Sequence, residues 1–149
     1  MMKNFKQYLT ENTISIDYID HDDFNDDSII DPSDAEKYAY NLAKRVNMGI
    51  TSDRELLAVA LYKNEMVGAI WQSFDDTVYT FDIAVEPKYQ GIGIGSKLID
   101  YGISNYDNYS DYPDASIQFD VTSPITKGAL ERRGFTVDHQ ISQNRWLMK

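Results

Sequence analysis

The most informative stretch of the sequence is Phe81-Asp-Ile-Ala-Val-Glu-Pro-Lys-Tyr-Gln-Gly-Ile-Gly-Ile-Gly-Ser-Lys-Leu-Ile99. Its first residues continue an apolar run typical of a β-strand, and its last residues begin a run with helical spacing. Gly91, Gly93 and Gly95 lie between the two runs. Glycine adopts positive φ and lets a ligand approach the main chain closely. A helix that starts at such a turn presents unpaired N–H groups and the positive end of its dipole. The stretch therefore predicts a phosphate-binding loop.

The chain on either side alternates strand-like and helix-like segments. Ser33 is the expected N-cap of the first helix, and Ser123 with Pro124 starts the last one. Gly49 and Gly134 are the expected C-terminal ends. The predicted elements are a strand at 14–18, a helix between 33 and 49, strands at 56–62, 66–74 and 78–85, a helix from 94, a strand at 116–121, a helix from 124, and short strands at 135–137 and 146–148. This order predicts an α/β fold with a mixed sheet.

Length and composition indicate one globular domain. The 149 residues are 42% hydrophobic and 26% charged, which suffices for a core. We expect residues 1–12 to be a polar lead-in and residues 13–149 to form the domain, as a monomer or homodimer. The sequence has no apolar run near 18 residues, no signal-peptide pattern and no cysteine. We therefore predict a cytoplasmic protein with no membrane association, no disulfide and no metal.

The net charge of −10 argues against a nucleic-acid partner, because phosphates require clustered Lys and Arg. It favours a cationic partner such as an amine. A polyphosphate ligand would need local positive charge, and Lys88 and Lys97 flank the glycines. The acidic segment Asp20 to Asp27 has three interpretations: a solvated loop, a lip that attracts a cationic substrate, or carboxylates that bind a divalent ion. Its spacing does not match an EF-hand loop.

Three interpretations of the glycines follow from the residues alone. A dinucleotide fingerprint would use Gly91, Gly93 and Ser96, but then the third glycine is missing and the motif lies mid-chain. A P-loop would need a Gly-Lys-Ser/Thr ending, which is absent. The third interpretation is a turn that only lets the strand and the helix pack closely.

A fourth interpretation comes from a family resemblance. Gln90-Gly-Ile-Gly-Ile-Gly95 fits the Q/R-x-x-G-x-G/A signature and resembles the GNAT (GCN5-related N-acetyltransferase) family. The preceding Ile83-Ala-Val85 and Glu86-Pro-Lys-Tyr89 resemble that family's hydrophobic strand and its V-x-P-x-Y lead. Gly134-Phe135 resembles its second landmark, a G-F pair at a helix end. The element order is also similar, so the resemblance covers residues 13–149.

The resemblance implies a single-domain, mixed and mostly antiparallel sheet flanked by helices, with a V-shaped split between two parallel central strands. It implies that acetyl-coenzyme A, the cosubstrate, lies in this split. The backbone of the strand end would pair with the pantetheine arm, and N–H groups of the loop would hold the pyrophosphate. The cofactor-binding residues predicted in this way are Ile83, Ala84, Val85, Gln90, Gly91, Ile92, Gly93, Ile94, Gly95 and Ser96.

Acetyl transfer to an amine needs a neutral amine, a stabilised oxyanion and a protonated leaving thiolate. A lysine-like amine is neutral in only about one molecule per few thousand at pH 7, whereas an α-amine costs only about 1 kcal/mol to deprotonate. Asp82 is the first candidate for the general base, with Asp75 and Asp76 after it; Asp82 is otherwise a structural carboxylate. By analogy with the family, the backbone N–H of Val85 would stabilise the oxyanion.

One position departs from the family pattern. The family often has a tyrosine four residues before the G-F glycine, placed to protonate the thiolate, and here that position is Leu130. A thiolate with a pKa near 8.5 is a tolerable leaving group without an acid. Tyrosines of the neighbouring helix and loop are candidate replacements: Tyr101, Tyr106, Tyr109 and Tyr112.

The predicted function is N-acetyl transfer from acetyl-CoA to a primary amine, by direct transfer because there is no cysteine to form an acyl-enzyme. The acceptor is expected to be cationic: a small amine, a polyamine, or a protein lysine or N-terminus. The alternative is a catalytically weak or inactive GNAT-fold module that binds acetyl-CoA or a protein partner, which the Leu130 departure and the acidic segments favour.

Overall fold

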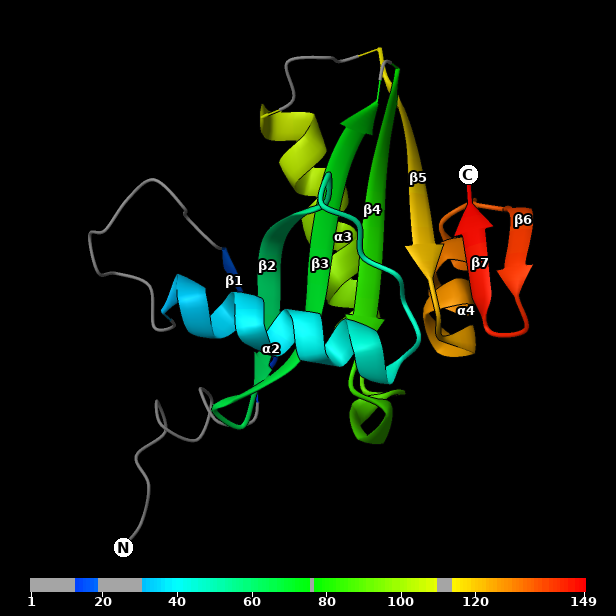
Figure 1. Cartoon of the computed structure of the whole chain (residues 1–149). Coiled ribbons are helices and arrows are strands. Elements are labelled where there is room, and N and C mark those ends of the chain that lie inside the picture. Colours follow the sequence, from blue (N-terminus) through cyan, green and yellow to red (C-terminus); the bar gives the residue numbers. More distant parts are fainter. Residues whose placement is uncertain (1–12, 19–30, 76, 110–113) are drawn as a thin grey trace, which may run out of the picture.

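A sheet with the strand order β1-β2-β3-β4-β5-β7-β6 runs through the molecule (Figure 1). The computed structural model describes residues 13–18, 31–75, 77–109 and 114–149. The strands are β1 Ser15–Tyr18, β2 Glu55–Tyr62, β3 Glu65–Asp75, β4 Val78–Val85, β5 Ser116–Val121, β6 Val137–Ser142 and β7 Arg145–Met148. The helices are α2 Pro32–Arg45, the 3-10 turn η1 Pro87–Tyr89, α3 Ile94–Tyr109 and α4 Pro124–Arg132. Among these elements, only β4 and β5 pair in parallel.

The helices lie on both faces of the sheet. Figure 1 shows α2 across the front face, with α3 and α4 behind it. The front layer packs alanines and Leu42 of α2 on Val59, Ala69 and Trp71. The larger rear core joins α3 to the sheet through residues such as Leu98 and Phe119. The predicted mixed, mostly antiparallel α/β fold is therefore confirmed.

The ends of α2 differ from the prediction. The N-cap is Asp31, not Ser33: the Asp31 carboxylate accepts a 2.8 Å hydrogen bond from the Ser33 N–H. Pro32 explains the difference, because proline is favoured at the first helical position and the cap then precedes it. The helix ends at Arg45, not near Gly49. Asn47 takes the left-handed conformation, with φ 58°, and the next N–H, of Met48, returns to the carbonyl of Ala43 at 2.9 Å, which is a Schellman ending.

The start of α4 agrees with the sequence, and the strand after it does not. The Ser123 hydroxyl accepts from the N–H of Ile125 at 3.2 Å, as expected of an N-cap. The penultimate strand begins at Val137 and runs to Ser142, beyond the predicted 135–137. All six of its residues are exposed. A strand with no buried face does not need alternating apolar and polar residues, so the sequence gives no strand signal there. Phe135 instead packs its ring on Phe119, 5.2 Å between centroids.

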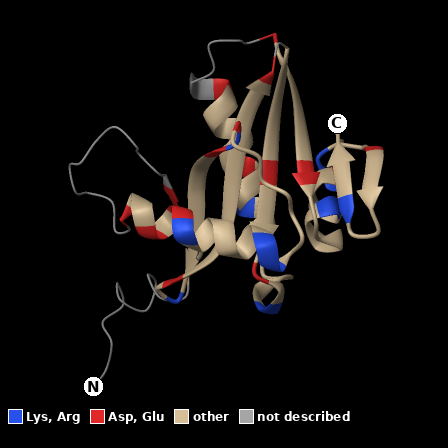
Figure 2. Ribbon diagram, viewed as in Figure 1, with Lys and Arg blue, Asp and Glu red and all other residues tan. Residues whose placement is uncertain are grey.

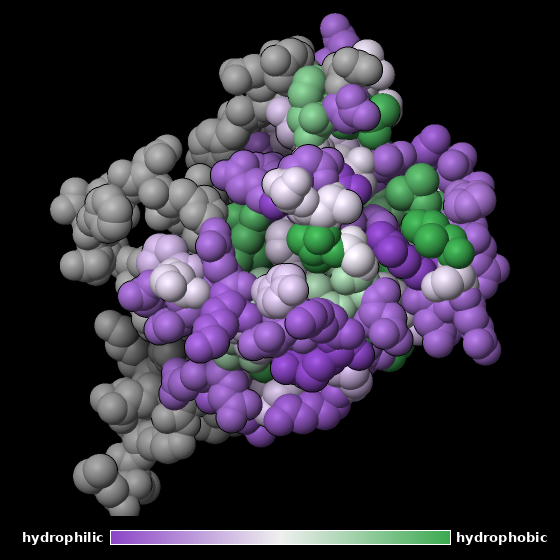
Figure 3. All heavy atoms as spheres, viewed as in Figure 1, coloured by the Kyte–Doolittle hydropathy of each residue, from purple (hydrophilic) through white to green (hydrophobic). Residues whose placement is uncertain are grey.

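The surface of the front face is mostly hydrophilic, and apolar side chains reach it over the β6–β7 hairpin (Figure 3). No helix in the described part of the chain is long and apolar enough to span a membrane. Residues 1–12, the acidic segment Asp20 to Asp27, Asp76 and Tyr112 lie outside the described residues, so the predictions made for them stay predictions.

Candidate functional site

The two central strands part at the end of β4. Pairing between β4 and β5 stops at Ile83 and Val121, while β4 continues to Val85 beside β3. The N–H of Glu86 donates to Val67 of β3 at 2.8 Å. Because hydrogen-bonding direction alternates along a strand, Ala84 also faces β3. The N–H and C=O of Val85 therefore point toward the side of β4 that β5 no longer covers, as the predicted split requires.

The glycine loop follows directly and presents free donors. Gly91 and Gly93 have φ of 91° and 98°, a conformation that other residues rarely adopt. The N–H groups of the first turn of α3, from Ile94 to Ser96, precede the first hydrogen bond of the helix and have no intrahelical acceptor. The first bond of the helix runs from Lys97 N–H to the Gly93 carbonyl at 3.1 Å. The N-terminus of the 16-residue helix α3 thus carries several unpaired donors and the positive end of its dipole.

Two predicted loop residues also have packing roles. A Cβ at Gly95 would lie 2.6 Å from the hydroxyl oxygen of Thr126, so only glycine lets α3 approach α4 this closely. The hydroxyl of Ser96 accepts a hydrogen bond from Arg133, whose guanidinium also binds Asp100 at 3.0 Å. The side chain of Ser96 is therefore already engaged, while its backbone N–H stays free.

Asp82 is fully buried on the front face of β4, with no exposed surface. Arg54 Nε lies 2.7 Å from one carboxylate oxygen, but neither oxygen accepts a hydrogen bond from an N–H or hydroxyl donor. Burial raises the pKa of Asp82 to about 7, against the opposing charge of Arg54 and with a further increase from Asp120. A carboxyl with a pKa near neutrality suits proton exchange. Asp75, by contrast, pairs with Val78 at the far end of the β3–β4 hairpin, away from the split.

Asp120 is the partner that the sequence analysis missed. It is the register neighbour of Asp82 across β4 and β5 and is 3% exposed. Figure 2 shows an acidic segment on β4 and one on β5 at the same level of the sheet. Arg145 of β7 binds Asp120 through two hydrogen bonds, Nε at 2.9 Å and Nη2 at 2.6 Å. A signal for this pair exists in the sequence, because Phe81-Asp-Ile83 and Phe119-Asp-Val121 have the same pattern.

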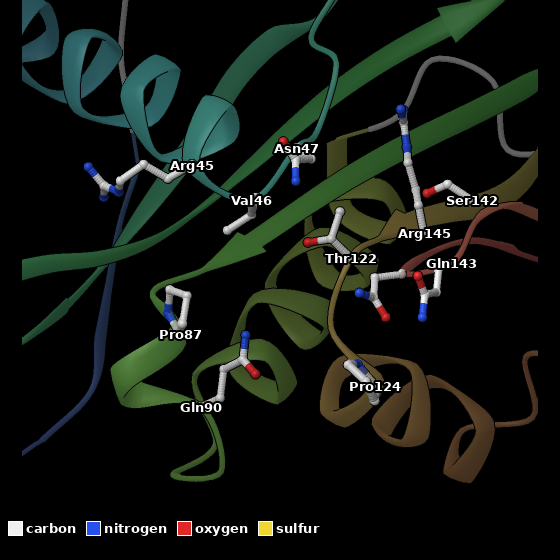
Figure 4. A pocket seen from close by; sticks show the side chains of 11 residues that line it. Arg45, Val46, Asn47, Pro87, Gln90, Thr122, Pro124, Ser142, Gln143 and Arg145 are labelled. Atoms are coloured by element: carbon white, nitrogen blue, oxygen red, sulfur yellow. The ribbon is translucent and has the colours of Figure 1, made fainter.

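A cavity of about 590 Å³ opens beside the split (Figure 4). Its walls come from the end of α2, the start of η1, the end of β5 and the β6–β7 turn. In Figure 4 the side chains of Asn47 and Gln90 reach toward its centre from opposite sides. The lining residues are Arg45, Val46, Asn47, Pro87, Gln90, Thr122, Pro124, Ser142, Gln143, Asn144 and Arg145. Of the predicted site residues, only Gln90 is among them.

One wall of the cavity is fixed by a charged cluster at the end of β4. Glu86 forms an ion pair with Arg45 and accepts a 3.1 Å hydrogen bond from the Tyr38 hydroxyl. Burial and the charge of Glu86 raise the pKa of Tyr38 above its usual range. These three residues tie α2 to the strand end that borders the split.

Of the candidate proton donors, Tyr101 and Tyr106 do not line the cavity, and the side chains of Tyr109 and Tyr112 lie outside the described part of the structure. Leu130 is completely buried in the rear core. Tyr106 donates its hydroxyl proton to the carbonyl of Ala115 at 2.9 Å, and Tyr101 packs against the rear core. The described residues therefore bring no predicted tyrosine to the cavity lining.

Comparison with known proteins agrees with this architecture. Residues 21–148 match the family model described as an acetyltransferase (GNAT) domain. No curated protein matches the chain. Solved structures similar to it include the following three. An acetyltransferase of the GNAT family from Streptococcus pneumoniae has a TM-score of 0.58 at 14% identity, covering 91% of this chain and 97% of that one.

The second is Arabidopsis thaliana Naa50 in complex with the bisubstrate analogue CoA-Ac-MVNAL, with a TM-score of 0.57, 15% identity and coverage of 91% and 96%. The third is yncA from Salmonella typhimurium with its cofactor acetyl-CoA, with a TM-score of 0.53, 16% identity and coverage of 92% and 91%. At these identities the structural likeness establishes a shared fold.

Proposed function

Because the chain belongs to the GNAT family of acetyltransferases, we propose that it transfers an acetyl group from acetyl-CoA to a primary amine by direct transfer. The observation that carries this proposal is the parting of β4 and β5. It leaves the backbone of Val85 uncovered shortly before the N-terminus of α3, where the N–H groups from Ile94 to Ser96 have no intrahelical acceptor.

These groups fit coenzyme A well. Unpaired N–H groups at a helix N-terminus suit a pyrophosphate, and a strand edge suits the amides of a pantetheine arm. We assign the backbone of Val85 to the arm and the N–H groups of the loop to the pyrophosphate. Ile83, whose backbone still pairs with Val121 of β5, contributes through packing. Ala84, whose backbone faces β3, contributes through packing. Acetyl-CoA is the ligand named for the Salmonella protein, and a CoA conjugate is named for the Arabidopsis one.

When bound, acetyl-CoA would supply an acetyl group activated as a thioester. The N–H of Val85, at the open edge of the strand, would stabilise negative charge on the carbonyl oxygen of the thioester. Asp82 would accept the proton from the amine side. Since Asp82 is buried and does not line the cavity, it would exchange that proton through an intervening group and not by direct contact with the amine.

We place the acceptor amine in the cavity beside the split. Its walls carry neutral hydrogen-bonding side chains such as Asn47, Gln143 and Asn144. Such walls accommodate an alkylamine, a polyamine or a peptide amine alike. The chain's net charge of −10 supports a cationic acceptor through long-range attraction.

A thermal-shift titration tests the cofactor assignment. We expect acetyl-CoA to raise the melting temperature, because a ligand at 100 times its Kd stabilises the folded state by about 2.7 kcal/mol. The same titration with pantetheine, which lacks the pyrophosphate and the adenosine of coenzyme A, is the control and should give a much smaller shift. Absence of any shift or calorimetric heat at millimolar acetyl-CoA would refute the assignment.

An amine panel tests the activity. The panel holds polyamines, lysine peptides and peptides with free N-termini, and the measurement is thiol release from acetyl-CoA. We expect turnover with at least one amine and none with the corresponding N-acetylated compound. Tight binding of acetyl-CoA with no turnover across the panel would instead support the second candidate function.

That second candidate is a module that binds acetyl-CoA with little or no catalysis. It is favoured by one observation: the position that would supply the proton donor is Leu130, buried in the core, and the described residues bring no tyrosine to the cavity. A thiolate leaves without an acid near neutral pH, so the lack of a proton donor would slow the proposed reaction without preventing it.

A further inference from the structure

Four charged side chains from four different segments meet on the front face of the sheet, close to the point where β4 and β5 part. Asp82 comes from β4 and Asp120 from β5. Arg54 precedes β2 and lies 2.7 Å from Asp82. Arg145 comes from β7 and holds Asp120 with two hydrogen bonds. The Asp82–Asp120 pair is one residue before the last paired position, Ile83 with Val121.

The geometry forces the two carboxyl groups together. Paired strands lie about 4.8 Å apart, and directly opposed residues project to the same face. Asp82 is 0% exposed and Asp120 is 3% exposed, so water does not screen their charges. Two carboxylates in such a site do not both ionise easily, and one proton between them relieves the repulsion. Asp120 raises the pKa of Asp82 both through its charge and through a side-chain hydrogen bond.

The two arginines contact the two carboxyl groups in different ways. Arg145 gives Asp120 two aligned, charge-assisted hydrogen bonds, whereas the carboxylate oxygens of Asp82 accept none. Arg54 donates to Ser73 and reaches Asp82 with its charge but without an aligned hydrogen bond. The proton therefore resides mainly on Asp82. The other polar side chains nearby, Thr80 and Gln118, bond to each other at 2.8 Å and do not titrate.

We propose that Asp82 and Asp120 act as one proton-sharing carboxyl pair, and that Asp120, by holding Arg145 at the cavity wall, is a positioning residue of the acetyltransferase site. The first part stands on the geometry of this cluster. The second part rests on the function proposed above.

The pair would change the charge beside the acceptor. With one shared proton, the two carboxyls and the two arginines carry a net charge of +1, which repels an ammonium group. Loss of the proton to solvent brings the cluster to zero. Since Arg145 belongs both to the cluster and to the cavity lining, KM for a cationic amine should fall as the pair loses its proton. kcat should rise in the same step, because Asp82 accepts a proton only when it is ionised.

The decisive experiment follows the aspartate carboxyl carbons by 13C NMR across pH, on the whole chain, with assignment by substitution. In the wild-type protein we expect the Asp82 signal to titrate near neutrality and the Asp120 signal to shift in the same step, as coupled groups do. Asp120→Asn removes the like charge, so the Asp82 midpoint should move down by about one pH unit or more. Arg145→Gln removes a cation, so the midpoint should move up.

Opposite shifts in these two variants are the signature of the pair, and Asp138→Asn, at an exposed carboxyl of β6, is the matched control. The proposed proton sharing would be refuted by an Asp82 titration midpoint in the ordinary acid range. It would also be refuted by a midpoint that is the same in Asp120→Asn as in wild type. If Asp120→Asn does not fold, the upward shift in Arg145→Gln still decides the matter.

The positioning role has its own readout, the pH profile of KM for a cationic amine found in the panel. We expect the profile to move to lower pH in Asp120→Asn and to return in Asp120→Glu. An unchanged profile alongside shifted NMR midpoints would confine Asp120 to a structural role. If no amine is acetylated at all, the proposed function fails while the NMR result still tests the pair.

Discussion

Gly93→Glu should abolish acetyl-CoA binding and leave the fold intact. The glutamate side chain would enter the loop just before the N-terminus of α3, where the N–H groups from Ile94 to Ser96 have no intrahelical acceptor, and would place a carboxylate against the pyrophosphate. Losing two charge-assisted hydrogen bonds, at about 1.5–3 kcal/mol each, weakens binding by at least about 100-fold. Isothermal titration calorimetry with acetyl-CoA measures this loss.

The folded state should tolerate the change. A Cβ at Gly93 meets no atom within 4 Å, so the cost is the strain of a non-glycine residue at φ 98°, roughly 1–2 kcal/mol. A carboxylate near the N-terminus of α3 returns part of this through the helix dipole. The melting temperature should therefore fall by only a few degrees.

Gly93→Ala is the matched control, because it imposes the same backbone strain without the charge or the length. We expect it to weaken binding only a few-fold. If Gly93→Glu retained micromolar affinity, the pyrophosphate would lie elsewhere, and if Gly93→Ala lost binding as fully as the glutamate variant, backbone strain would be the cause.

The part of the site that carries local signals could be predicted from the sequence. The strand from Val78 to Val85 is a continuous β-type run bounded by turn residues, and the structure places β4 at those bounds. The glycine loop lies between that strand and a helix as expected. Residues that follow one another in the chain are positioned by local geometry, so the sequence motif was enough to predict where this strand, loop and helix lie.

The partners of Asp82 could not be predicted in the same way. Arg54, Asp120 and Arg145 come from three other segments, and their contact with Asp82 or with one another depends on strand register and on the order of strands in the sheet. Local periodicity does not contain that information. The repeated Phe-Asp-Ile/Val pattern on β4 and β5 indicates a shared environment, but only the parallel register turns it into a contact.

The cavity lining escaped prediction for a related reason. Asn47, Gln143 and Asn144 lie in turns, where polar residues are common and carry no periodic pattern. They become a wall only because α2 ends at Arg45 and because β6 and β7 form a hairpin. The polar residues of β6 gave no strand signal, and so the first strand of the hairpin that supplies two of these side chains was predicted at 135–137, too early in the chain.

Asp82→Asn should change how stability depends on pH. The pKa of Asp82 is about 7 in the folded state against 3.8 for an ordinary aspartate. Below pH 3.8 the carboxyl is protonated in both states, so its ionisation costs nothing. As pH rises toward 7 the unfolded chain ionises while the folded chain keeps its proton, so stability declines. Above pH 7 the full difference, about 4 kcal/mol, is lost.

Asparagine is close in shape to the protonated aspartate and does not titrate, so it removes this decline. We therefore expect the free energy of unfolding of Asp82→Asn minus that of wild type to be larger at pH 8 than at pH 5 by roughly 2–3 kcal/mol, so that the variant is relatively more stable at pH 8. Urea unfolding at the two pH values measures this difference, and taking it between variants cancels the titration of all other groups. Asp138→Asn makes the same chemical change at an exposed position and serves as the control. A difference between Asp82→Asn and wild type that is equal at pH 5 and pH 8 would mean that Asp82 is ionised in the folded protein throughout, held by Arg54 as a permanent ion pair, and the site would then lack a carboxyl able to exchange a proton near neutral pH.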